Sequence, residues 1–81
     1  PDYRVEWVSM PKGQQIKPHV SPHAQTVLLL SGQVLMTTPD WSGLLSHAGQ
    51  AVQLDPVVSL ALDAHDHSHL LLLKAPVVYP L

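Results

Sequence analysis

Cysteine and phenylalanine are absent from this 81-residue chain, and charged residues make up only 12% of it. Without cysteine the chain can form no disulfide, no thiolate metal site and no cysteine nucleophile. Four Lys and Arg against six Asp and Glu give a formal charge of −2, which leaves no basic stripe for binding phosphates or an anionic membrane surface. We therefore expect neither a nucleic acid nor a membrane as partner.

Long hydrophobic runs are missing as well. The longest cover residues 27–30 and 70–73, far short of the roughly 20 residues that a membrane span needs. The amino-terminal residues also lack the apolar segment of a signal peptide. These absences predict a soluble protein, and we expect it in the cytoplasm.

Hydrophobic residues nevertheless form 46% of this 8.8 kDa chain, whose length suits one domain over residues 1–81. A domain of this size hides only about 60–65% of its unfolded surface, so a chain this apolar should leave hydrophobic area exposed. We expect a homodimer, the simplest arrangement that covers such a surface. The first apolar segment around Trp7 is the edge that we expect to pair with its mate.

Eight prolines are spread along the whole chain and leave little room for helices. Residues 43–48 fit either a single helical turn with Asp40 as its N-cap or a loop. The other segments between turn signals are β-branched, aliphatic or alternating, and predict strands over residues 4–10, 26–30, 33–38, 51–54, 57–62, 67–73 and 77–79. Several short strands at this spacing predict an all-β fold, a small antiparallel β-barrel or jelly roll.

Six histidines outnumber Lys and Arg together. Side chains alternate along a strand, so His65, His67 and His69 should share one face, at about 6.6 Å between neighbours. The same alternation puts His19 and His23 on one face of an earlier segment. If the two segments face each other across a barrel, the imidazoles converge where a divalent metal could bind. His47 stands alone in a loop and is interpreted as no ligand.

A glycine and histidine pattern in the first half resembles the first motif of the cupin superfamily, which reads Gly, His, His, Glu, Gly. Gly13, His19 and Gly32 match this motif at its spacing. Ser21 stands at the position of the second histidine, and Gln25 at that of the glutamate. Two of the three metal ligands that this motif normally supplies are therefore altered.

The second cupin motif, Gly, Pro, Gly, His, Asn, falls on Pro56, Leu62, Ala64, His67 and Leu71, of which only the histidine matches. The resemblance extends over about residues 5–76. It implies a double-stranded β-helix, an antiparallel barrel with one open end. Inside it, three histidines and a carboxylate would hold a divalent transition metal, which could be iron, manganese, nickel, zinc or copper.

By this resemblance, His19 and His67 carry over as metal ligands. His23 could replace the lost imidazole if the strand bends at Pro22, and Gln25 could coordinate through its amide oxygen. The expected metal site therefore consists of His19, His23, His67 and Gln25. Two further histidines serve as replacement ligands or as partners that orient the ligands, namely His65 and His69.

Two functions remain open from the sequence. The first is a metal-dependent enzyme acting on a small organic substrate, for which the resemblance implies dioxygenase or isomerase chemistry. The second is a non-catalytic cupin module with a degenerate metal site that binds a small molecule or serves in dimerisation. A third, weaker hypothesis makes the histidine cluster a pH-sensitive element.

Overall fold

Every regular element in the described part of the chain, residues 3–75 of a computed structural model, is a β-strand. No helix with the length and hydrophobicity of a membrane span occurs in these residues. The expectation of an all-β fold is confirmed. The strands are β1 (Arg4–Met10), β2 (Gln15–His19), β3 (Gln25–Ser31), β4 (Val34–Thr37), β5 (Ser42–Leu45), β6 (Ala51–Leu54), β7 (Leu60–Ala64) and β8 (Ser68–Lys74).

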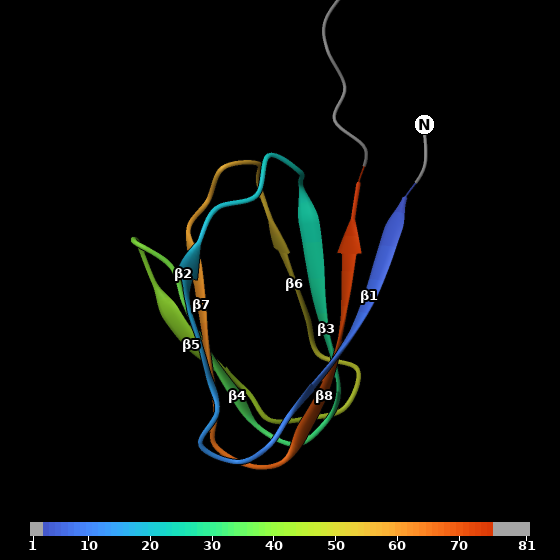
Figure 1. The fold of residues 1–81 in the computed structure, drawn as a ribbon, viewed down its shortest axis with the longest axis vertical. Helices are drawn as coiled ribbons and strands as arrows, with labels where there is room; N and C mark the ends of the chain where they lie inside the picture. Colours follow the sequence, from blue (N-terminus) through green and yellow to red (C-terminus); the bar gives the residue numbers. More distant parts are fainter. Residues whose placement is uncertain (1–2, 76–81) are drawn as a thin grey trace, which may run out of the picture.

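The strands form two four-stranded sheets that face each other (Figure 1). The sheet with the order β1-β8-β3-β6 is called sheet A here, and the sheet with the order β2-β7-β4-β5 is called sheet B. All pairings in both sheets are antiparallel. This is the antiparallel jelly-roll barrel that the sequence predicts.

The core fills the space between the sheets with side chains at alternate strand positions, because successive residues of a strand point to opposite faces. On β3, for example, Val27 and Leu29 are fully buried, while Leu28 and Leu30 between them are half-buried on the outer face. The buried cluster consists of Met10, Val27, Leu29, Val34, Met36, Leu45, Leu54, Leu60, Leu62, Ala64, Leu70 and Leu72.

Three segments differ from the expected strand pattern. The strand expected over residues 57–62 is β7, which runs over Leu60–Ala64 instead, because residues 56 and 57 form a turn in which Val57 has a φ of 60°. Residues 42–45 form strand β5, which pairs with β4 from Val34 to Thr37, so the helical turn and the loop considered for residues 43–48 are both wrong there. The reason is the edge of β4, whose free backbone groups recruit this short segment. Residues 15–19 form a further strand, β2. The strand expected at residues 77–79 lies outside the described residues.

The barrel has two distinct ends. At one end, which we call the mouth, β2 leads into β3 through residues 20–24, and β6 leads into β7 through residues 55–59. A backbone hydrogen bond from Val57 N to Ser21 O at 2.9 Å joins these two segments, and another from Ala75 N to Ala24 O at 2.9 Å joins the first of them to the residue after β8. The opposite end carries the turn at residues 65–67.

At the opposite end, the turn between β3 and β4 packs closely against the start of β8. Gly32 there has a φ of +94°, which only glycine adopts without strain, and a Cβ atom would collide with the His67 carbonyl and the Ser68 hydroxyl. The Ser68 Oγ is fully buried and accepts a hydrogen bond from Gln33 N at 3.0 Å. These contacts fix the distance between the two turns.

Candidate functional site

The structure does not bring the expected metal ligands together. In the ladder between β3 and β8, Gln25 pairs with Lys74 at the mouth, whereas Ser31 pairs with His69 near the opposite end. Six residues of strand separate these pairs, a distance of roughly 20 Å. The histidine tract at residues 65–69 therefore lies at the far end of the barrel from His19, and the convergence expected for the two segments does not occur.

The tract itself is a turn rather than a strand for most of its length. β7 ends at Ala64 and β8 begins at Ser68, so His65 and His67 do not share a strand face with His69. Asp66 causes the turn, because its Oδ1 accepts a hydrogen bond from His67 N at 2.8 Å. The rings of His67 and His69 still meet edge to face, with centroids 5.0 Å apart.

His19 does face the interior of the barrel, for a reason that simple alternation misses. Ile16 pairs with Leu62 and His19 pairs with Leu60, so three steps on β2 match two steps on β7. This bulge turns His19 to the face of the fully buried Leu60. The His19 Nδ1 atom lies 3.3 Å from Lys17 O. Since a carbonyl only accepts, Nδ1 carries the hydrogen and Nε2 remains an acceptor.

The next two polar positions belong to the loop between β2 and β3. Ser21 is buried, and its Oγ accepts a hydrogen bond from His23 N at 3.2 Å. The His23 Nδ1 donates to Ala75 O at 2.8 Å, across the end of β8. The ring of His23 is thus tied to sheet A, and Pro22 lies in a loop rather than in a bent strand.

Gln25 is the most unusual residue of the mouth. Its side chain continues the inward series of Val27 and Leu29 on β3 and is only 4% exposed. Among the described residues, its Oε1 atom has no hydrogen-bond partner. An unsatisfied buried acceptor costs about 1–3 kcal/mol. A core residue of similar size would avoid this cost, so the amide is a candidate for contact with a ligand.

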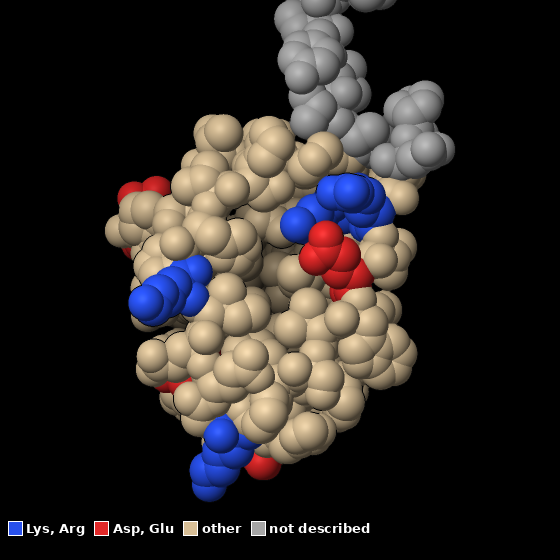
Figure 2. Space-filling model, in the orientation of Figure 1, with Lys and Arg blue, Asp and Glu red and all other residues tan. Residues whose placement is uncertain are grey.

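Basic side chains stand beside Gln25. Lys74 pairs with Gln25 on one side and with Arg4 on the other, and directly opposite residues of a sheet point to the same face. The Lys74 Nζ is 3.4 Å from Glu6 Oε1, and the Lys74 side chain is only 16% exposed. Figure 2 shows basic and acidic side chains beside a hollow on this face of the molecule. The inner face of sheet A thus carries two cations and one carboxylate at the mouth, and Asp55 lies in the loop between β6 and β7 at the same end.

These residues do not fit the four-ligand metal site that the resemblance implies. Of the ligand positions in the first motif, only the first still carries a histidine, His19. Ser21 and Gln25 stand at the other two positions, and the apolar Leu60 lies opposite His19 on β7. Within residues 3–75, no three His, Cys, Asp or Glu side chains are placed to hold one ion. The ammonium group of Lys74 next to Gln25 also repels a dication.

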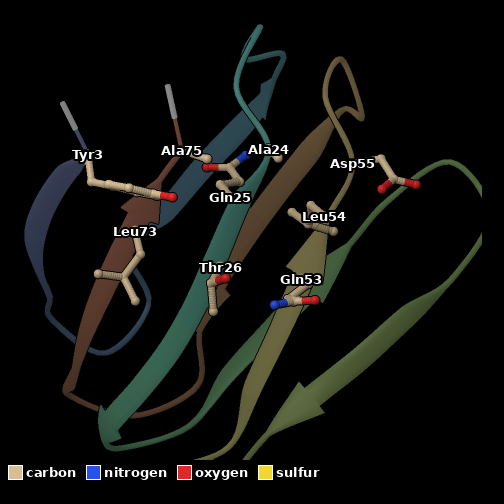
Figure 3. Close-up of a pocket in the computed structure, with 9 residues that line it drawn as sticks. All are labelled: Tyr3, Ala24, Gln25, Thr26, Gln53, Leu54, Asp55, Leu73 and Ala75. Carbon is tan, nitrogen blue, oxygen red and sulfur yellow. The ribbon is translucent and has the colours of Figure 1, made fainter. Parts of the chain in front are cut away.

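A separate hollow of about 490 Å³ lies on the outer side of sheet A at the mouth end (Figure 3). Thr26, Gln53 and Leu73 face away from the core and form its floor, and Tyr3 lines it beside them. The rim is completed by Ala24, Gln25, Leu54, Asp55 and Ala75. Gln25 and Leu54, which face the interior of the barrel, are thus also among the residues that line this hollow.

The basic residues of the mouth, Arg4 and Lys74, were not expected from the sequence. A signal was present, because the alternation of Leu70 and Leu72 along β8 extends to Lys74. What the alternation could not indicate is that β8 lies between β1 and β3. This order is what places Lys74 beside both Arg4 and Gln25.

Neither a model of a known protein family nor a curated protein sequence matches this chain. Solved structures do. The chain is 28% identical to a conserved protein of unknown function from Streptococcus pyogenes, with a TM-score of 0.83. The match covers 100% of this chain and 68% of the Streptococcus protein. An RmlC-like cupin from Shewanella frigidimarina is 18% identical, with a TM-score of 0.84 and coverages of 91% and 66%.

A third neighbour is an RmlC-like cupin family protein with a double-stranded β-helix fold from Methanocaldococcus jannaschii. It is 18% identical, with a TM-score of 0.83 and coverages of 93% of this chain and 71% of that one. The chain thus spans about two thirds of the length of these neighbours.

Proposed function

Given that this chain has the cupin fold, the double-stranded β-helix of its structural neighbours, we propose that it is a ligand-binding module. In this proposal the mouth holds a small organic acid that carries a hydroxyl group, and no metal takes part. This corresponds to the second of the two functions left open by the sequence, a cupin module with a degenerate metal site.

The observation that carries the proposal is the unpartnered amide of Gln25, 4% exposed on the inner face of β3. A ligand hydroxyl that donates to Oε1 removes the cost of leaving this acceptor unsatisfied. The terminal torsion of a glutamine is soft, so the amide can turn toward a donor without straining the strand. The second acceptor at the mouth is His19 Nε2, since Nδ1 is taken up by Lys17 O.

The charges beside Gln25 favour an acid over a neutral or cationic ligand. Lys74 and Arg4 share the inner face with Gln25, and Glu6 balances only one of these two cations. A carboxylate near Lys74 and Arg4 gains charge-assisted hydrogen bonds. The same cations disfavour a dication, which argues against the metal-dependent enzyme.

Binding of acids tests the proposal. Isothermal titration with lactate and with propionate compares two acids that differ by one hydroxyl, and gluconate with hexanoate forms a larger pair. We expect the hydroxy acid of at least one pair to bind about 5- to 150-fold more tightly, the range that one hydrogen bond to a buried acceptor supplies. Gln25→Leu should remove this preference, and Lys74→Met should weaken both acids. Lys12→Met, in the exposed loop after β1, is the matched control and should change neither.

Two results would contradict the proposal. One is equal binding of both acids in every pair, or none at all. The other is uptake of one Zn²⁺ or Ni²⁺ ion per chain that is lost in His19→Ala and His23→Ala, which would favour the metal-dependent function instead. His67→Ala should have no effect on either titration, because His67 lies in the turn at the opposite end.

A further inference from the structure

The hollow on the outer side of sheet A has a floor made by one row of side chains that crosses three strands. Leu73 on β8 pairs with Thr26 on β3, and Thr26 pairs with Gln53 on β6. Directly opposite residues project to the same face, and neighbouring strands lie about 4.7–4.9 Å apart. The floor therefore presents an aliphatic group, a hydroxyl and an amide at a regular spacing of roughly 5 Å.

Tyr3 and Asp55 stand at the two ends of this row. Tyr3 directly precedes β1, and Asp55 directly follows β6. Figure 3 shows the Tyr3 side chain extending over the end of β8, with its hydroxyl directed toward Gln25. The row from β8 to β6 crosses two strand spacings, about 10 Å. The volume of about 490 Å³ lies within the range of roughly 300–1,000 Å³ that is usual for small-molecule sites.

The charge of the hollow favours a neutral ligand. Among the described residues that line it, Asp55 is the one with a charged side chain, and there is no Lys or Arg. An anionic ligand would therefore meet a like charge without a compensating cation. A cationic ligand would gain little, because an ion pair with an exposed carboxylate contributes only about 0–1 kcal/mol. A neutral ligand with two adjacent hydroxyls can donate to both carboxylate oxygens.

The polar groups are confined to the hollow and do not continue over the outer face of sheet A. In the next row of this face, Trp7 pairs with Leu71, Leu71 with Leu28, and Leu28 with Ala51. The one polar group among these side chains, the indole N–H, already donates to His69 Nδ1 at 3.2 Å. Hydrogen-bonding side chains on this face are thus gathered where the surface is concave.

We propose that the hollow binds a neutral disaccharide whose two pyranose rings are joined in an extended linkage. Such a molecule spans about the 10 Å of two strand spacings. Its apolar C–H faces fit the Tyr3 ring and the Leu73 side chain, since an aromatic residue offers apolar area together with a polar tip. Its hydroxyls find groups that both donate and accept at Thr26 and Gln53, and a pure acceptor at Asp55.

Isothermal titration with cellobiose, maltose and tyramine tests the proposal. Cellobiose has the extended β-linkage and should bind with a dissociation constant of about 1 mM or lower, at least about 5-fold more tightly than the bent maltose and more tightly than the cation tyramine. Asp55→Asn should weaken cellobiose about 10-fold and Thr26→Val about 3-fold. The matched controls are Asp40→Asn and Thr37→Val, at exposed positions outside the hollow, and should change nothing.

Three results would overturn the proposal. The first is no binding of cellobiose up to about 20 mM, and the second is an equal effect of Asp55→Asn and Asp40→Asn. The third is tighter binding of tyramine than of cellobiose, which would assign the hollow to amines. Circular dichroism verifies that each variant is folded, and Thr26→Val gives a second reading if Asp55→Asn does not fold.

The disaccharide site does not rest on the acid site proposed above, and the two fail separately. Lys74 lies on the inner face of sheet A, so Lys74→Met should weaken the acids and leave cellobiose binding unchanged. Asp55→Asn should have the opposite pattern. Neither variant alters Gln25, which points into the barrel and also lines the hollow.

Discussion

At the scale of single residues, Gln25 occupies a buried position at which an apolar side chain would make the folded protein more stable. Its neighbours in the inward series of β3, Val27 and Leu29, are both fully buried and apolar. An apolar residue at position 25 would extend this series and remove an unpartnered acceptor from the interior. A polar residue that weakens a core is expected where it serves binding. The amide is therefore better explained by a ligand than by packing.

Gln25→Leu should consequently stabilise the protein while it removes the preference for hydroxy acids. We expect the free energy of unfolding to rise by about 1–2 kcal/mol, because the desolvation penalty of the amide disappears at nearly constant volume. Urea denaturation measures this change. Gln15→Leu, at an exposed position of β2, is the control and should stay within about 0.5 kcal/mol of the wild type. A less stable Gln25→Leu would mean that the amide has a structural partner.

At the scale of elements, the sequence predicted the strands well where alternation and length were strong. The segments from Arg4 to Met10 and around Val27 and Leu72 are strands as expected. The errors come from local features that override alternation. A bulge in β2 turns His19 inward, and Asp66 closes a turn where a strand of histidines was expected. Neither feature leaves a periodic signal in the sequence.

The candidate site was predicted only in part for the same reason. His19 and Gln25 do lie at the mouth on the inner face. His67 does not, because the turn that contains it lies at the opposite end of the barrel, and the sequence does not indicate at which end a turn lies. The contribution of Lys74 depends on the order of strands within sheet A. Strand order is set by contacts between distant parts of the chain, which a local pattern cannot contain.

The turn at the opposite end offers a prediction at this scale. Ser68 Oγ is fully buried and accepts from Gln33 N, and its single hydrogen is donated to Asp66 O at 2.8 Å or to Gln33 O at 3.1 Å. Ser68→Ala should lower the free energy of unfolding by about 1–3 kcal/mol, since the half-buried Gln33 N–H loses its partner. Urea denaturation against Ser42→Ala, an exposed serine of β5, measures this effect. A change as small as in the control would mean that water replaces the hydroxyl.

At the scale of the whole molecule, the two faces of sheet A differ in charge and polarity. The inner face carries the charged residues and the unpartnered amide near the mouth, and the outer face carries exposed aromatic and aliphatic side chains without charge. The composition already indicated that a chain with 46% hydrophobic residues would expose apolar surface. The structure concentrates that surface on one sheet, so a single contact with another copy can cover it.

Because association stabilises only the folded chain, the homodimer expected around Trp7 makes the melting temperature depend on protein concentration. We expect the wild-type melting temperature to rise by about 3–5 °C for each tenfold increase in concentration, given the small unfolding entropy of a chain of this size. Differential scanning calorimetry at concentrations from about 5 μM to about 500 μM, the range in which dimers of micromolar affinity dissociate, would measure this slope. In Trp7→Glu the slope should vanish, because the added carboxylate must lose its hydration to enter the interface. A slope that persists in Trp7→Glu and disappears in Leu44→Glu would place the contact on sheet B instead.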